Sequence, residues 1–335
     1  MINVQPLVDR VIETVSRHAL GNGAYARYLW QDKEGGRNLA ADPYGCADAA
    51  NILYTVGALP TGEEALAMVR AMQGLQDPES GLFQSMDAHH PIHTTAHVVA
   101  ALELFDAKPL YPLRALEEYF TIPGMIGLLE TMAPAENPWS ISHQGAGIYA
   151  AGVITGSVTP EWENAYFDWF WKNADPITGI SLKGALDRSK VTEHGYHRYL
   201  YGWFHYLFNH EYAHRPFPHV EKTLNSLAVM QRWNLFGADF GKYCDFRPID
   251  VVYVSSRCMR KTPHRFAENL AFLDKFADEY LENLFALDPE KDDSMNDLHR
   301  LFGALCAVAE LQSVLPGKLY TKKPLRLVLD RRPFI

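Results

Sequence analysis

A run of apolar and small residues recurs along this chain at intervals of about fifty residues, a spacing typical of repeat architectures. The six runs begin at Cys46, Thr94, Ser142, Tyr196, Ile249 and Asn296. Each run is apolar on nearly every side of a helical projection, as expected for a helix that is buried all round. The repeat therefore predicts six buried helices built from one recurring unit.

More amphipathic segments lie between these runs, at residues 62–75, 110–120, 161–174, 219–233 and 265–287. Their apolar residues recur at i, i+3, i+4 and i+7 with charges on the opposite face, which predicts half-exposed helices. The N-terminal stretch "MINVQPLVDRVIETVSRHAL" is also predicted to be helical. Alternating buried and amphipathic helices predict an all-α fold, an (α/α)6 toroid or barrel of six helical hairpins. An open solenoid of the same hairpins is the alternative.

The prediction covers residues 1–335 as a single toroid domain with a short C-terminal extension at about 317–335. Strand signals are sparse. The best candidate is "LRLVLD" near the C-terminus, whereas "IDVVYV" is assigned to a helix because of its place in the repeat. The basic tail "KKPLRLVLDRR" is interpreted as a solvated segment.

The net charge of −9 argues against nucleic acid or an anionic membrane as a partner. No secretion signal and no apolar stretch long enough to span a membrane is found, and the four cysteines form no CxxC pair. These features predict a cytoplasmic protein with reduced thiols. Nucleotide-binding and nucleophile-elbow fingerprints are missing too, so we expect no cofactor. The sequence indicates no oligomeric state.

Polar residues gather at the head of each buried helix, after turns such as "DPESG" at 77–81 and "DPITG" at 175–179. They are Tyr44 and Asp48; His93 and His97; Trp139, His143 and Gln144; His194, His197, Arg198 and Tyr199; Asp250 and Tyr253; and Asp297 and His299. In a closed ring these heads meet at one rim, where the helix N-termini favour an anionic or oxygen-rich ligand. The pattern predicts a central polar pocket.

Within this set we predict four catalytic side chains, His197, Asp48, Asp250 and His143, for proton transfer. Arg198 is the expected partner of a carboxylate or sulfate, and Trp139 and Tyr44 are expected to flank a sugar ring. The other expected substrate-binding residues are His93, His97, Gln144, His194 and Tyr253.

Several of these residues have structural alternatives. Asp48 and Asp250 could instead cap their helices or interact with the helix dipole from the first turn. Trp203, His205, Tyr206 and His210 are interpreted as core residues. His93 and His97 stand four residues apart, as two metal ligands can, but lack a glutamate between them. No metal is therefore expected.

The stretches "MQGLQDPESGLFQS" and "GADFGKYCDFRPIDVVYVSS" resemble the repeat of the terpenoid cyclase and protein prenyltransferase toroids. The resemblance implies the architecture alone, because "EKDDSMND" does not match the DxDD acid of class II cyclases. Asp250 is followed by Val251 and Val252, where the prenyltransferases place the cysteine of their zinc site. Six-hairpin glycosidases, unsaturated-uronyl hydrolases, uronate lyases and N-acylglucosamine 2-epimerase-like isomerases share this architecture.

From the rim chemistry and this shared architecture, we expect an intracellular carbohydrate-active enzyme. It would hydrolyse, eliminate or epimerise a small oligosaccharide or uronate, a small-molecule substrate. Two alternatives remain open at this point, an isoprenoid cyclase or prenyltransferase-like enzyme and a non-catalytic binding toroid.

Overall fold

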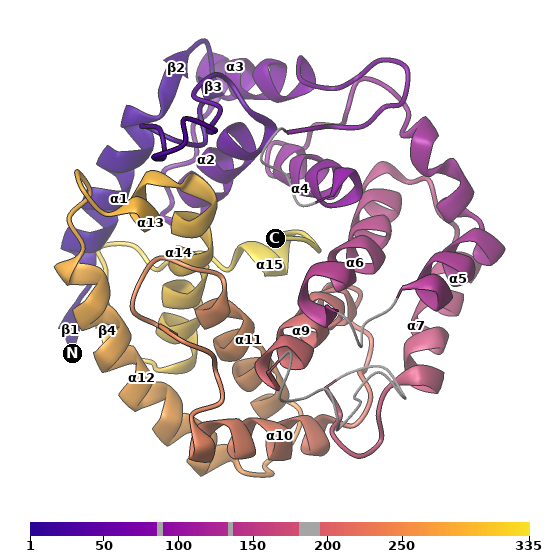
Figure 1. The fold of residues 1–335 in the computed structure, drawn as a ribbon, viewed down its shortest axis with the longest axis vertical. Coiled ribbons are helices and arrows are strands. Elements are labelled where there is room, and N and C mark those ends of the chain that lie inside the picture. The colour runs from indigo at the N-terminus through magenta and orange to yellow at the C-terminus, as the bar shows by residue number, and fades with distance from the viewer. Residues whose placement is uncertain (86–89, 133–136, 181–194) are drawn as a thin grey trace.

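The computed structural model describes residues 1–85, 90–132, 137–180 and 195–335, which are mostly α-helical. Six helices surround the centre of the molecule in Figure 1 and are called inner helices here. They are α2 (Pro43–Thr55), α4 (Pro91–Glu103), α6 (Pro138–Thr155), α9 (His197–Tyr212), α11 (Arg247–Met259) and α14 (Leu298–Val314). The repeat thus located all six buried helices to within a few residues.

The outer helices lie around the periphery in Figure 1. They are α1 (Gln5–Arg17), α3 (Gly62–Gln73), α5 (Ile122–Thr131), α7 (Pro160–Asn173), α10 (Val220–Trp233) and α12 (Phe266–Ala286). Each inner helix packs against the next along the chain, and α14 also packs against α2.

Small residues allow the inner helices to approach one another closely. Residues 92–102 of α4 are buried without interruption, although they include two histidines and two threonines. Between α6 and α9, a Cβ on Gly202 would lie 2.6 Å from the carbonyl oxygen of Pro138, so only glycine fits at this crossing. The all-round burial predicted from composition is confirmed.

Two local predictions were wrong. Residues 110–120 contribute the 3₁₀ helix η1 (Arg114–Phe120), and the outer helix of that unit is the following segment, α5. The C-terminal "LRLVLD" contains a short helix, α15 (Val328–Arg331), rather than a strand.

The basic tail is solvated in part, as predicted, because Lys322, Lys323 and Arg326 are exposed, but its last residues are buried. It ends at the centre of Figure 1, with α15 packed against α2 and α9. Arg332, Phe334 and Ile335 are almost wholly inaccessible to solvent. Arg257 of α11 anchors the tail through an ion pair of 2.7 Å with Asp330. The tail therefore fills space that the inner helices leave at the centre.

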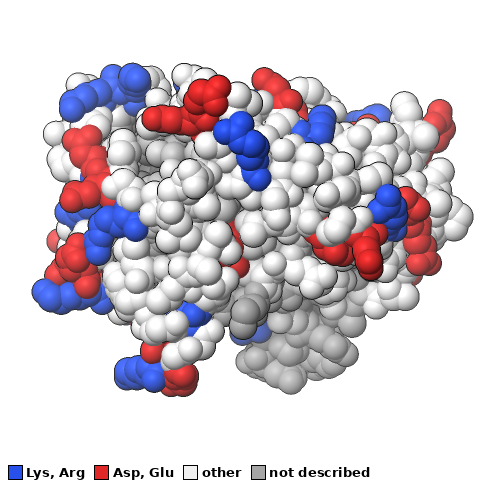
Figure 2. All heavy atoms as spheres, turned by 90° about the horizontal axis from the view of Figure 1, so that it is seen from above, with Lys and Arg blue, Asp and Glu red and all other residues white. Residues whose placement is uncertain are grey.

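The remaining elements are short. Strand β1 (Ile2–Asn3) pairs in parallel with β4 (Leu319–Tyr320), β2 (Ala19–Gly21) pairs antiparallel with β3 (Ala24–Tyr25), and α13 (Asp293–Asn296) precedes α14. No helix in the described ranges has the length and apolar character needed to cross a bilayer. On the face drawn in Figure 2, basic and acidic side chains are interspersed.

The turn at 77–81 shows the structural role of the Asp-Pro-x-x-Gly pattern, which occurs again at 175–179. The Asp77 carboxylate accepts a hydrogen bond of 2.9 Å from the backbone N–H of Ser80, and Gln76 donates one of 2.9 Å to the carbonyl of Gly81. Gly81 has a φ of +77°, and a Cβ there would lie 1.9 Å from the carbonyl oxygen of Pro112. The turn thus presses against the loop before η1.

We therefore expect Gly81→Ala to destabilise the fold much more than Gly156→Ala. Gly156 also has a positive φ, +71°, but a Cβ there meets nothing within 4 Å. The control should lose about 1–2 kcal/mol of unfolding free energy from backbone strain alone, and Gly81→Ala should lose about 3 kcal/mol or more. Urea unfolding of both variants measures the difference, and equal losses would contradict the close approach to Pro112.

Candidate functional site

A cavity of about 440 Å³ lies at the N-terminal ends of α4, α6, α9, α11 and α14. Its lining is polar and aromatic and comes from both ends of the chain. The lining residues are Arg27, Tyr28, Arg37, His93, Asn137, Trp139, Ser140, His143, Arg198, His205, Asp245, Phe246, Asp293, Asp297, His299, Arg300 and Ile335. The cavity has the volume of a small-molecule site.

One part of the lining is held by a buried ion pair between the N-terminal segment and the start of α14. The Arg27 guanidinium donates two hydrogen bonds, of 2.8 and 2.9 Å, to the carboxylate of Asp297. Asp297 also caps α14 by accepting from the N–H of His299. Despite the cost of burial, Arg27 holds the pKa of Asp297 below its usual range. Arg37 makes a second two-pronged pair with Asp293, at 2.7 Å for both contacts.

Three histidines lie in a row on the cavity lining. The ring centroids of His93 and His143 are 4.4 Å apart, and those of His143 and His205 are 4.3 Å apart. The Tyr44 hydroxyl lies 2.6 Å from Nδ1 of His93, and the Ser142 hydroxyl lies 2.7 Å from Nδ1 of His205. These hydroxyls fix the orientation of the rings at both ends of the row.

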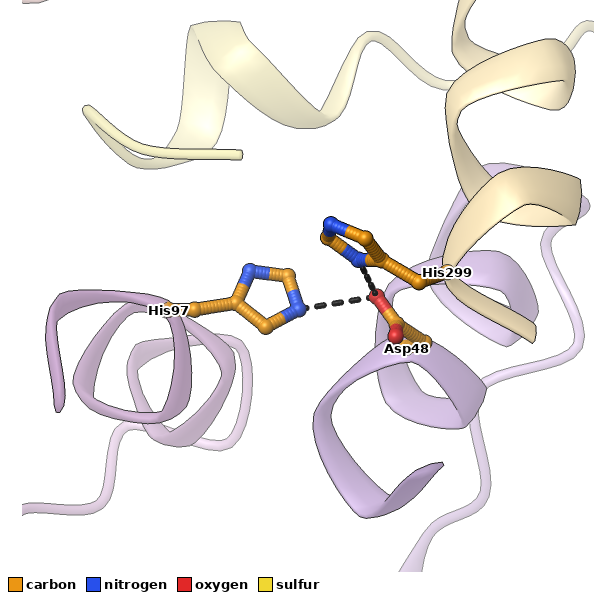
Figure 3. A group of neighbouring side chains, drawn as sticks. All are labelled: Asp48, His97 and His299. Carbon is orange, nitrogen blue, oxygen red and sulfur yellow. Dashed lines mark hydrogen bonds and ion pairs between the residues drawn. The ribbon is translucent and has the colours of Figure 1, made fainter. Parts of the chain in front are cut away.

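A second cluster is more deeply buried than the cavity lining and joins three inner helices (Figure 3). His97 Nε2 of α4 lies 2.8 Å from Asp48 Oδ1 of α2, and His299 Nδ1 of α14 lies 3.1 Å from the same oxygen. Burial lowers the pKa of His97 to about 4 against the pull of Asp48. Burial also opposes the charge on Asp48, but His299 and His97 outweigh it and hold the pKa of Asp48 below its usual range.

The structure brings together a majority of the predicted site residues. His93, Trp139, His143 and Arg198 line the cavity. Three others contact the lining residues from the protein interior. Tyr44 bonds to His93, Asp48 bonds to His299, and His97 bonds to Asp48. Neither aspartate suspected of capping does so, because Asp42 caps α2 and Asp250 lies inside the first turn of α11.

Four other predicted residues of the described chain also lie outside the cavity lining. His197 packs against Tyr201 and the loop at Gly237, and burial lowers its pKa to about 4. Asp250 and Tyr253 are fully buried within the helix packing, and burial raises the pKa of each well above its usual range. Gln144 is half-buried on α6. The remaining prediction, His194, lies outside the described residues.

Other lining residues were missed. His205 was interpreted as a core residue but lines the cavity, whereas Trp203, Tyr206 and His210 are indeed buried. Arg27, Tyr28 and Arg37 belong to a segment outside the repeat, whereas Asp245 lies ahead of α11 and Asp293, in α13, lies ahead of α14. Of these residues, only Asp245 and Asp293 could have been found from the sequence, because each lies just ahead of a predicted buried helix.

Comparison of the chain with protein-family models, with curated proteins and with solved structures gives no match. The site is therefore interpreted from its own geometry.

His18 supports the segment that carries Arg27. Its Nδ1 lies 3.0 Å from the carbonyl oxygen of Ala26, and its ring is buried. Burial lowers the pKa of His18 to about 4, against the ordinary value of 6.5, although the bond to Ala26 pulls the other way. The neutral form is therefore the one that fits the folded state.

We expect the protein to lose stability as the pH falls from 7 to 5, in part because of His18. A histidine with a depressed folded pKa contributes stability above pH 6.5, and this contribution is lost as the pH falls towards 4. For His18 the loss at pH 5 is about 2 kcal/mol. His18→Asn places an amide donor near the Nδ1 position without a titrating group, so its unfolding free energy should fall less. Urea unfolding at both pH values checks this, and identical pH dependence in both proteins would contradict it.

Proposed function

We propose that this protein is an enzyme that acts on a small uronate or a related sugar acid by moving protons at carbon. The observation that carries the proposal is the histidine row in a cavity that also contains Arg198 and Arg300, which form no close ion pair with a described residue. Arg27 and Arg37 are engaged by aspartates, whereas Arg198 makes no ion pair with any described residue. Arg300 approaches Asp297 no closer than 4.0 Å.

These two arginines suit the carboxylate of a sugar acid, since a guanidinium can bind a carboxylate through two hydrogen bonds. The N-terminal ends of the surrounding helices add favourable partial charge for an anion. Trp139 offers an aromatic face for the sugar ring, whereas the Tyr28 ring is stacked by Arg27 and Arg37. These features support an anionic, hydroxyl-rich ligand over a neutral apolar one.

The row formed by His93 and His143 supports elimination or epimerisation over hydrolysis. One imidazole takes the proton on the carbon next to the carboxylate, and the electron pair moves into that carboxyl group. In epimerisation a proton returns to the opposite face of the same carbon. In elimination the electron pair forms a C=C bond while the C–O bond on the next carbon breaks, and the departing oxygen takes a proton. Hydrolysis by a carboxylic acid pair needs a protonated member. Here Asp245, Asp293 and Asp297 are each paired with an arginine.

We also propose that the six inner helices close into an (α/α)6 toroid. The packing of α14 against α2 supports closure, as do the hydrogen bonds that join Arg27 to Asp297 across 270 residues. Closure would explain why one cavity receives side chains from five different helical repeats.

Incubation with glucuronate, galacturonate and uronate disaccharides in D₂O tests the activity. Wild-type protein should exchange a carbon-bound proton or release an unsaturated product, followed by NMR. His143→Ala and His93→Ala should each lower the rate by about 100-fold or more. Arg198→Gln should raise KM more than it lowers kcat.

His264→Gln is the matched control, because His264 lies half-buried against Asn225 away from the cavity and should leave the rate unchanged. Full turnover by His143→Ala, or turnover of neutral sugars alone, would overturn the proposal.

A further inference from the structure

The buried cluster of Asp48, His97 and His299 is not used in the proposed proton transfers. Its three side chains come from α2, α4 and α14 and point towards one another (Figure 3). Each offers a ligand atom, and these atoms all lie within 4.8 Å of one another. Asp48 and His97 are completely buried, and His299 is nearly so. Three different helices thus hold three donors in one small volume.

The hydrogen bonds within the cluster leave one oxygen of the Asp48 carboxylate without a partner. Both histidines approach the same oxygen, Asp48 Oδ1, whereas the buried Oδ2 has no hydrogen-bond partner among the described residues. No lysine or arginine of the described chain forms an ion pair with Asp48 either. A buried carboxylate is costly unless a cation or a full set of hydrogen bonds compensates it. The two histidines compensate the carboxylate through Oδ1, and a bound cation would complete the compensation at Oδ2.

We propose that Asp48, His97 and His299 bind one divalent transition-metal ion of the zinc type. Two imidazoles and one carboxylate are ligands that zinc accepts, whereas calcium and magnesium prefer oxygen alone. His97 would bind through Nε2 and His299 through Nδ1, the atoms that now face Asp48. On binding, each imidazole carries its proton on the other ring nitrogen, the Asp48 carboxylate replaces its two hydrogen bonds with a metal bond, and no group is oxidised or reduced.

The position of the cluster says which kind of metal site this is. Three protein ligands leave one place open in tetrahedral zinc coordination, the arrangement of catalytic rather than structural sites. His299 also lines the cavity, so the ion would lie next to the ligand-binding space. The inference concerns metal binding and does not depend on the proposed sugar chemistry.

Removal of metal with a chelator, followed by titration with Zn²⁺ in a calorimeter, tests the inference. Wild-type protein should bind one equivalent, and its melting temperature should rise by about 5 °C at a hundredfold excess of Zn²⁺ over Kd. Asp48→Asn and His97→Asn should each weaken binding by more than about 100-fold, because each removes a direct ligand.

His210→Asn is the matched control. His210 is as fully buried as His97 and also lies on an inner helix, but its Nδ1 bonds to the carbonyl of Tyr206 and it is outside the cluster. This variant should bind Zn²⁺ as the wild type does. Circular dichroism identifies any variant that fails to fold, and His299→Asn then supplies the replacement.

Absence of Zn²⁺ binding by the wild type would overturn the inference, and so would unchanged affinity in folded Asp48→Asn or His97→Asn. Failure of the sugar chemistry is a separate result. It shows as a lack of deuterium exchange with every uronate, whereas metal content and melting temperature report on this cluster alone.

Discussion

The inner helices of this protein are apolar on nearly every face. The architecture follows from the need to bury these faces away from water. A helix such as α4, buried from residue 92 to residue 102, needs a neighbour on each flank, an outer helix behind it and something in front. Neighbouring inner helices supply the flanks, and the C-terminal tail supplies part of the front with Phe334 and Ile335. Covering apolar surface in this way is the main favourable term in folding. The polar cavity remains only where the helices begin.

Positions that depend on the repeat could be predicted from sequence. "IDVVYV" was assigned to a helix against its β-branched composition and lies in α11, where packing outweighs local propensity. The same repeat placed His143 and Arg198 at the heads of α6 and α9, where they line the cavity. A periodic pattern predicts which end of a helix a residue occupies. For His143 and Arg198 this was enough to predict their place near the cavity.

The direction in which a side chain points from its helix could not be predicted, and neither could contacts between residues far apart in the sequence. His197 and Arg198 are adjacent, but successive residues of a helix point about 100° apart, so one lines the cavity and the other faces Gly237. Arg27 carries no repeat signal, and its place in the site depends on Asp297, which lies 270 residues away. In the tail, the exposure of Lys322, Lys323 and Arg326 was predicted, but the burial of its last residues was not. Arg332 is buried against Phe302 with a bond to Asn51.

The pairing of Arg27 with Asp297 also has a consequence for synthesis on the ribosome. The segment that carries Arg27 is made 270 residues before its partner Asp297, and α2 is likewise made long before α14, against which it packs. Until α14 has been made, α2 therefore exposes an apolar flank and the cavity lacks the lining residues of α14. Long-range contacts of this kind slow folding and prolong the exposure of apolar surface. Completion of the cavity therefore waits for the synthesis of α14, whichever of its other parts have already folded.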